Sequence, residues 1–468
     1  MWRSRESSET VTAALASVVD ASDLITDPAL IGRRLRDNSW LSPVLKTYID
    51  DMAGASGRSL DVCALISPVD AEQLRSCVSL LYRQGAPIVV LGAGTTNFGQ
   101  TTPLDGGVVI EMKHFDHVGI PQDGRISVGA GTTTGAVDEM AHTAGLEVPV
   151  MTTTYATATS GGWVSGGHIG LGSPTWGSIW DDNVVGATLM TVEEEPRVLT
   201  LDESSIEPVL HSYGTTGILT DVTFRLVRAR QWTELVVCFD DFDAACRFAA
   251  AVSERPGLRI RAAAAQEPAI TPCFSALRGH VEPDEAIVIS IIDDDQHDQF
   301  TDLALDHGGR IVPWRGRGAD HRPTLAYMVY GHRMLWVKKI APLGAFLHCY
   351  LDPDDPLTQL ATLKRRFGDA IMVELKFLRS RWLMERFGHS GEGVLPAPLV
   401  CLVEGEKNLA AVMSFCDETG IRYQNPHTFF LDQKGLLRDP DVIKRFKAEV
   451  DPKGLLNPGK FSDDKVRT

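Results

Sequence analysis

Seven glycines fall within the seventeen residues from 161 to 177 of this chain. Glycine loses more conformational entropy on ordering than any other residue, so a regular packed element would not choose this density. We therefore expect residues 163–177 to form a loop without helix or strand. A favourable interaction must compensate for the entropy that such a loop loses when it becomes ordered. A large flat ligand that lies close against the backbone would supply that interaction.

A second glycine-rich segment, residues 92–100, follows directly after the apolar run of residues 87–91. This run is short and rich in β-branched residues, which predicts a buried strand. Backbone N–H groups fixed at the end of such a strand form an anion-binding concavity, and the glycines allow a phosphate to approach closely. A simple tight turn is the alternative for this segment alone, because G-x-G is a weak motif. Two such segments in one domain favour a dinucleotide that lies extended between them.

A nicotinamide-binding Rossmann domain is one way to hold a dinucleotide. Glu111 lies about 20 residues beyond the first glycines, where that motif keeps its ribose-binding acid. The motif also requires a helix directly after the glycines. Pro103, Gly106 and Gly107 interrupt this interval, and nothing in it has helical period. A Rossmann domain is therefore disfavoured.

The pattern around these segments predicts mixed strands and helices. Asp70 with Gln73 forms a capping box that opens a helix ending near Gly85. Further strands are expected over residues 61–68, 107–111, 125–129, 182–190 and 217–226, and a helix over 135–144. Because these elements do not follow strict βαβ repetition, we expect an α+β domain.

Beyond residue 231 the glycine-rich segments stop, and strands and helices alternate. Strands are expected over 234–239, 286–292 and 371–377, and a strand-like run is expected after Leu335. Helices are expected over 242–253, 296–307 and 439–450. A chain of 468 residues also exceeds what one core usually organises. We therefore divide it into an N-terminal arm (1–57), a first domain (58–230), a second α+β domain (231–430) and a C-terminal piece (431–468).

Charge and cysteine usage exclude several classes of protein. The formal charge of −16, from 45 basic and 61 acidic residues, disfavours a nucleic-acid partner. No apolar stretch approaches the roughly 20 residues of a membrane span, and residues 1–12 lack the apolar core of a secretory signal, so we expect a cytoplasmic protein. The eight cysteines include no C-x-x-C pair, which argues against an iron–sulfur cluster or a structural zinc site.

An ordered set of short segments resembles one family. The segments are residues 87–100, 107–111, 128–131, 158–162, 170–177, 182–184 and 214–218, and they occur in the order found in the PCMH-type FAD-binding domain of the vanillyl-alcohol oxidase and p-cresol methylhydroxylase family. Residues 451–461 resemble the tail of its D-lactate and glycolate dehydrogenase branch. The resemblance covers residues 58–230 and about the last dozen.

The resemblance implies an α+β fold in which a two-part FAD-binding domain carries an inserted α+β cap domain for the substrate. Residues 92–100 would then grip the pyrophosphate, residues 158–167 would line the ribityl and isoalloxazine path, and Ile218 would meet FAD through its backbone. Lys460 in the tail would stabilise negative charge on the reduced ring, with a solvated terminal lysine as the alternative. The residues expected to bind FAD are Gly92, Ala93, Gly94, Thr95, Thr96, Asn97, Gln100, Ala158, Thr159, Ser160, Gly161, Gly162, Ser165, Gly166, Gly167, Ile218, Asn457 and Lys460.

The chain departs from the family at two places. Many members carry a histidine in the first glycine-rich segment that bonds covalently to the flavin, whereas the matching residue here is Thr95. We therefore expect non-covalent FAD, with His168 as the residue to suspect should a covalent bond exist. The histidine-rich metal motif of several 2-hydroxyacid dehydrogenases is missing from the cap, so no metal site is expected.

Catalytic residues are expected on the cap, because flavin enzymes leave the hydride chemistry to the ring and need a group that removes a proton. The candidates are His427, Tyr423, His332, Arg333 and Lys376. His427 is preferred as the base, since burying an imidazole that has no function in an aromatic, proline-anchored segment would cost free energy. A solvated strand face is the alternative for Lys376, and a surface position is the alternative for His332 and Arg333.

These expectations together predict an FAD-dependent oxidase or dehydrogenase. It would oxidise a small alcohol, hydroxy acid or phenolic substrate by hydride transfer, with oxygen or a carrier as electron acceptor. A homo-oligomer is possible. The alternative is a flavin-binding protein without turnover, used as a sensor or kept as a structural relic.

Overall fold

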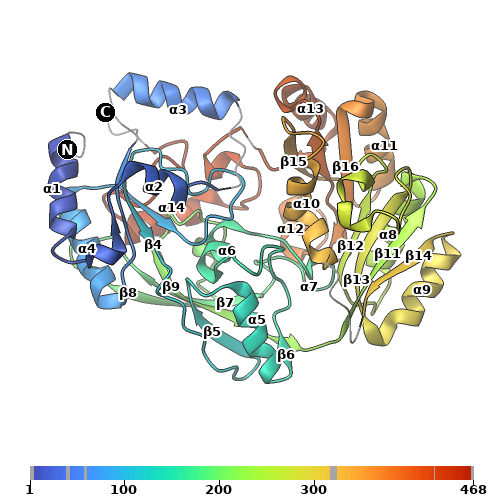
Figure 1. Ribbon diagram of the computed structural model, residues 1–468, viewed down its shortest axis with the longest axis horizontal. Helices are drawn as coiled ribbons and strands as arrows, with labels where there is room; N and C mark the ends of the chain where they lie inside the picture. The colour runs from blue at the N-terminus through green and yellow to red at the C-terminus, as the bar shows by residue number, and fades with distance from the viewer. Residues whose placement is uncertain (1–4, 38–42, 57–60, 317–323, 426, 465–468) are drawn as a thin grey trace.

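The computed structural model describes residues 5–37, 43–56, 61–316, 324–425 and 427–464. Figure 1 shows two lobes, one built on two four-stranded sheets and one on a nine-stranded sheet. We refer to the first lobe as the N-terminal domain and to the second as the cap. The α+β class predicted from the sequence is confirmed.

The first sheet of the N-terminal domain is built around parallel strands. Its order is β1 (Leu24–Ile25), β2 (Val62–Ile66), β4 (Gly107–Glu111) and β3 (Ile88–Leu91), and only β1 is antiparallel to its neighbour. Helix α4 (Ala71–Gln84) begins at Asp70, whose side chain accepts a hydrogen bond from Gln73 N at 2.8 Å, as the capping box predicts. The glycine-rich residues 92–100 follow the end of β3.

Both ends of the chain join this sheet. Helices α1 (Arg5–Leu15), α2 (Pro28–Arg34) and α3 (Pro43–Ser56) form most of the expected arm, and β1 between the first two pairs with β2. At the other end, Ile88 N donates to Leu455 O at 2.8 Å and Asn457 N donates to Ile88 O at 2.7 Å. The tail after α14 (Pro440–Val450) therefore lies beside β3, next to the start of the first glycine-rich segment.

The second sheet is antiparallel and carries the other glycine-rich segment. Its order is β5 (Arg125–Gly129), β9 (Ile218–Arg225), β7 (Val184–Met190) and β8 (Val198–Asp202), and α5 (Thr134–Thr143) follows β5. A two-residue ribbon, β6 (Leu146–Glu147) with β10 (Val227–Arg228), extends this side of the domain.

The expectation of a continuous loop over residues 163–177 is wrong, because two short helices form there. They are α6 (Ser160–Gly166) and α7 (Ser173–Trp176). Thr159 caps α6 by accepting a hydrogen bond from Gly162 N at 3.4 Å. A methyl group on Gly161 would lie 2.8 Å from the Cβ of Ala130, so glycine lets the helix pack close to the end of β5. Close packing thus outweighs the weak helix propensity of the glycines.

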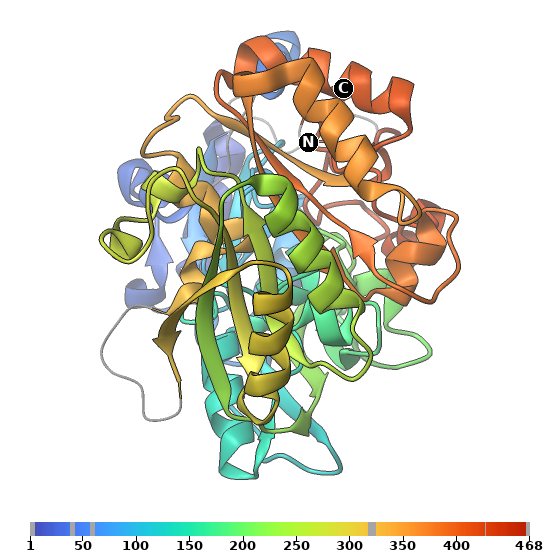
Figure 2. The same cartoon turned by 90° about the vertical axis from the view of Figure 1, so that its right-hand side faces the viewer.

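The cap is one antiparallel sheet with the strand order β14 (Arg310–Arg315), β11 (Trp232–Phe239), β13 (Ala286–Asp293), β12 (Ile260–Gln266), β16 (Ile371–Leu378), β18 (Leu399–Leu402), β15 (Ala345–Tyr350) and β19 (Arg422–Tyr423), with β17 (Leu395–Pro396) beside β16. Its outer face is covered by α8 (Phe242–Glu254), α9 (His297–Asp306), α11 (Pro356–Phe367) and α13 (Gly405–Thr419), and α8 and α9 lie in front of the strands in Figure 2. Helices α10 (Tyr330–Val337) and α12 (Arg381–Arg386) lie on the opposite side of the sheet, where the core continues into the N-terminal domain.

The strand-like run expected after Leu335 is wrong, because helix α10 extends through Val337. The same helix carries Leu335 and the candidates His332 and Arg333. No helix in the described ranges has the length and apolar character that crossing a membrane requires.

Candidate functional site

Two adjoining cavities lie where the glycine-rich segments meet the cap. The inner cavity, about 700 Å³, lies within the N-terminal domain, and the interface cavity, about 1020 Å³, lies between that domain and the cap. They share five lining residues, so the two cavities adjoin at the glycine-rich segments. The shared residues are Thr95, Thr96, Gln100, Gly162 and Gly166.

The wall of the inner cavity is glycine backbone with hydroxyl-bearing side chains. Its lining includes Gly92, Gly94, Gly161 and Ser165, and no carboxylate is among the lining residues. A methyl group on Gly92 would collide with the Thr159 hydroxyl, so close approach there depends on glycine. Bare backbone and neutral donors without negative charge suit a phosphate-bearing ligand such as FAD.

Fourteen of the residues expected to bind FAD line one or both cavities, and four do not. Ser160 is buried and donates to Thr132 O at 3.0 Å, and the side chain of Ile218 is fully buried. Asn457 Nδ2 donates to Gln100 O at 3.0 Å and to Tyr213 O at 2.6 Å. Lys460 Nζ donates to Gly99 O at 2.8 Å and to Thr102 O at 3.0 Å. Asn457 and Lys460 therefore do not line the cavities but bind the backbone carbonyl groups of the first glycine-rich segment and its continuation.

Two polar side chains of the first segment already have protein partners. Thr96 Oγ1 donates to Asp37 Oδ2 at 2.7 Å, and Gln100 Oε1 accepts from Phe98 N at 2.9 Å. These bonds order the segment, and they leave the backbone as the main source of donors for a ligand.

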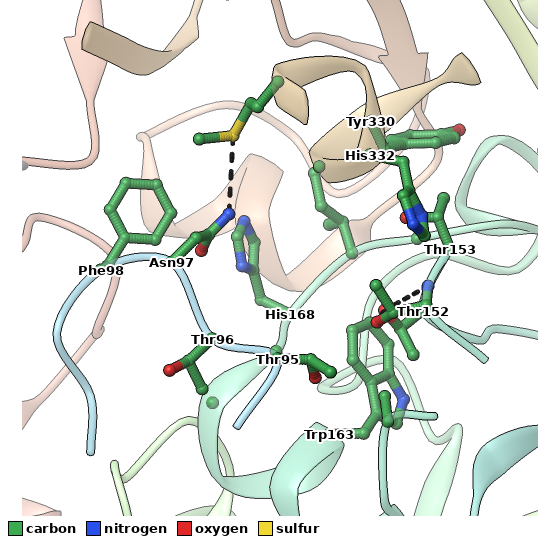
Figure 3. A pocket seen from close by; sticks show the side chains of 18 of the residues that line it. Thr95, Thr96, Asn97, Phe98, Thr152, Thr153, Trp163, His168, Tyr330 and His332 are labelled. Atoms are coloured by element: carbon green, nitrogen blue, oxygen red, sulfur yellow. Dashed lines mark hydrogen bonds between the residues drawn. The ribbon is translucent and has the colours of Figure 1, made fainter. Parts of the chain in front are cut away.

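His332 is the catalytic candidate that lines the interface cavity. Burial lowers its pKa, while a hydrogen bond from the ring to the Thr153 backbone acts in the opposite direction. Its Nδ1 is buried without a hydrogen-bond partner. Figure 3 shows the imidazole beside Thr153, across the cavity from Thr95 and Thr96. A neutral imidazole with an unpartnered ring nitrogen is able to accept a proton.

Arg333 and Lys376 lie behind the cavity wall, in a fully buried charge cluster with Glu374. Arg333 Nε is 3.2 Å and Lys376 Nζ is 3.5 Å from the Glu374 carboxylate. The carboxylate also accepts from Gln266 Nε2 at 2.9 Å. Burial, the largest cause, lowers the pKa of Lys376. The expected alternatives, a solvated face for Lys376 and a surface position for Arg333, are therefore wrong.

Tyr423 and His427 do not line either cavity. The Tyr423 hydroxyl lies 3.0 Å from Asp417 Oδ1, at a separate cavity. His427 N donates to Asn425 Oδ1 at 2.8 Å, and burial, followed by the charge of Lys434, lowers the pKa of its imidazole.

Two buried histidines that were not predicted as catalytic also line the interface cavity. His168 follows α6, and His348 lies on β15. Burial, as the largest cause, holds both pKa values well below the ordinary value, so both rings are neutral. A histidine inside the glycine-rich segment could have been found from the sequence. His348 stands in an apolar strand pattern and gives no such signal.

The fold and the two cavities therefore define the flavoprotein class, with an inner cavity that suits FAD and a cap that borders the outer cavity. Residues 63–200 match the model of the FAD binding domain. The chain contains an FAD-binding domain of the PCMH type and is an FAD-dependent oxidoreductase. In the described part of the chain, no group of three or more His, Cys, Asp or Glu side chains is placed to hold a metal.

Known proteins similar to this chain include two hydroxy-acid enzymes. It is 26% identical to D-lactate dehydrogenase of Archaeoglobus fulgidus over 193 residues, which is 39% of this chain and 43% of that protein. It is 22% identical to glycolate oxidase subunit GlcD of Bacillus subtilis over 430 residues, which is 85% of this chain and 88% of that protein. The match to the first spans less than half of that protein.

A solved structure of alkyldihydroxyacetonephosphate synthase has the same fold. It superposes with a TM-score of 0.69 at 14% identity, covering 97% of this chain and 85% of that one.

Proposed function

We propose that the protein oxidises a small hydroxy acid or alcohol by hydride transfer to FAD, and that His332 accepts the hydroxyl proton. The observation that carries this proposal is the unpartnered Nδ1 of His332 at the interface cavity. The names of the relatives, D-lactate dehydrogenase and glycolate oxidase, favour a hydroxy acid over a simple alcohol or a phenol.

Bound FAD supplies the hydride acceptor. The protein has to orient the substrate and remove one proton. Because burial lowers the pKa of His332, its neutral imidazole is able to take up that proton, and we assign the unpartnered Nδ1 as the accepting atom. Lys338, at the C-terminal end of α10, also lines this cavity and supplies a positive charge for a substrate carboxylate.

The alternative is a flavin-binding protein without turnover. It predicts that no hydroxy acid or alcohol reduces the bound flavin. The proposal predicts that one of them does so rapidly, because the cavity brings a proton acceptor and an ammonium group to the same ligand.

The test is anaerobic stopped-flow mixing of the FAD-loaded protein with D-lactate, L-lactate, glycolate and a benzylic phenol, followed by the loss of oxidised-flavin absorbance. His332→Gln should bind FAD normally and slow this reduction by about 10²- to 10⁴-fold, the usual contribution of a positioned base. The matched control His142→Gln removes an exposed imidazole from the end of α5 and should react like the wild type.

His427→Gln is the competing arm, because His427 was the base expected from the sequence. Slow reduction in His427→Gln together with a normal rate in His332→Gln would transfer the role to His427. If no substrate in the panel reduces the wild-type flavin, the proposed activity fails for these substrate classes.

A further inference from the structure

A separate cavity of about 850 Å³ lies on the cap side of the molecule, and its lining shares no residue with the interface cavity. The ends of α12 and α13, strand β19 and the segment after it form its wall. We refer to it as the basic cavity. Its lining residues are Arg386, Phe387, Cys416, Asp417, Gly420, Ile421, Arg422, Tyr423, Asn425, Gln433, Lys434 and Gly435.

Two arginines in this wall repel each other without a neutralising acid. Burial, followed by the positive charge of Arg422, lowers the pKa of Arg386. Within the described ranges, no carboxylate lies within ion-pair distance of either guanidinium. Arg386 Nε is moreover buried without a hydrogen-bond partner. Buried polar groups in proteins are normally paired, so an orphaned guanidinium nitrogen facing a like charge indicates a missing anion.

The other charged residues of the wall do not supply that anion. Asp417 accepts a hydrogen bond from the Tyr423 hydroxyl at 3.0 Å, and it does not contribute to the pKa shift of Arg386. Lys434 also lines the cavity, but burial lowers its pKa to about 7, so it adds only part of a positive charge near neutral pH. Its side chain is fully buried, and Nζ makes one long contact of 3.5 Å to Phe98 O. A wall with two arginines outside any ion pair and one engaged carboxylate stands out in a chain whose formal charge is −16.

We propose that the basic cavity binds a small oxyanion with two negative charges, a phosphate monoester or a dicarboxylate, between the guanidinium groups of Arg386 and Arg422. The planar fork of donors on arginine matches both groups and makes paired, charge-assisted hydrogen bonds to them. This site is independent of the proposed oxidation, because it shares no residue with the cavity of His332.

The position of the site gives the anion a structural consequence. Arg422 pairs with Tyr350 across β19 and β15, and Phe387, the neighbour of Arg386, packs on the Tyr350 ring at 4.8 Å between centroids. An anion bound by both arginines therefore holds the strand partner of Tyr350 and the neighbour of the ring that packs on it.

The test is isothermal titration calorimetry of the FAD-saturated protein with inorganic phosphate and, in a second arm, with malonate. Saturation with FAD keeps phosphate out of the glycine-rich segments. We expect one phosphate or malonate per chain, and the preferred anion identifies the head group of the ligand. Arg386→Gln and Arg422→Gln should each weaken this binding at least about tenfold, since each loses charge-assisted hydrogen bonds.

Arg365→Gln is the matched control, because it removes the same charge from exposed α11 of the cap and should bind like the wild type. Unchanged FAD content and melting temperature would show that the variants fold. No saturable binding of either anion to the wild type would overturn the proposal. Equal binding by the wild type and both arginine variants would overturn it as well.

Discussion

Nε2 of His168 lies 3.1 Å from the hydroxyl oxygen of Tyr350. The imidazole belongs to the glycine-rich part of the N-terminal domain and the phenol to strand β15 of the cap, so this hydrogen bond joins the two lobes at the interface cavity. Both side chains are buried, and His168 is neutral because burial lowers its pKa. The bond therefore links two uncharged groups that have little access to water.

Removing the phenol hydroxyl should weaken the junction between the lobes. Tyr350→Phe leaves His168 Nε2 buried without its partner, which costs about 1–3 kcal/mol of unfolding free energy. Urea unfolding of the FAD-bound protein measures the loss. Tyr82→Phe, at a partly exposed tyrosine of α4, is the control and should change stability by less than about 0.5 kcal/mol. Equal stability of Tyr350→Phe and the wild type would show that the bond contributes nothing.

Two neighbouring glycines of α6 should respond differently to the same substitution. A methyl group on Gly161 would lie 2.8 Å from Ala130 Cβ and 3.1 Å from Ala130 O, so Gly161→Ala should destabilise the apoprotein by about 1–3 kcal/mol through overpacking. A methyl group on Gly162 meets only the Thr159 hydroxyl, at 3.0 Å, and Gly162 lines both cavities. Gly162→Ala should therefore keep apoprotein stability and weaken FAD binding.

Denaturant unfolding of the apoproteins and fluorescence titration with FAD separate these two effects. Identical behaviour of the two variants in both measurements would contradict the arrangement of α6 between Ala130 and the cofactor cavity.

Local sequence patterns predicted the elements whose signals are local. The capping box at Asp70 and the apolar run before Gly92 correspond to α4 and β3, because caps and buried strands depend on a few adjacent residues. Helix α6 was missed for the opposite reason. Its glycines argue against a helix, and the contact that stabilises it is with Ala130, some thirty residues earlier in the chain.

The cofactor side of the site was more predictable than the substrate side. Residues 92–100 and 158–167 are continuous segments that both line the two adjoining cavities. The cap contributes several residues of α10, among them His332, together with His348 from β15 and Gln424 next to β19. The packing of α10 and the order of strands in the cap sheet bring these residues together, and no sequence period encodes either.

FAD should be held without a covalent bond. Thr95, which lines both cavities, stands where related proteins carry a linking histidine, and a threonine hydroxyl is a poor substitute for imidazole as the linking nucleophile. Precipitation with acid should leave the yellow colour in the supernatant. Flavin retained in the denatured pellet would contradict this expectation, and mass spectrometry of a His168→Ala variant would then test whether His168 forms the bond.

Stability should rise with pH just above neutrality because of two buried lysines. Burial lowers the pKa of Lys434 and of Lys460 from 10.5 to about 7, and Lys434 further lowers that of Lys460. Between pH 7 and 10.5 the unfolded chain therefore binds more protons at these residues than the folded protein does, so the free energy of unfolding increases with pH. The buried histidines contribute a similar slope only below their ordinary pKa of 6.5, and the buried thiols oppose it only near and above their ordinary value of 9.0.

The window from about pH 7 to 8.5 thus isolates the lysines. Lys434→Met removes a buried cation whose one hydrogen bond is long, so it should raise the urea midpoint at pH 7 and flatten the increase toward pH 8.5. Lys407→Met, which removes an ammonium that is 76% exposed on α13, should keep the wild-type slope. The measurements use buffers without phosphate or carboxylates, because an anion in the basic cavity would favour the charged form of Lys434. A wild-type midpoint that falls across this window, or a Lys434→Met curve parallel to that of the wild type, would show that the ammonium groups are not desolvated as the structure indicates.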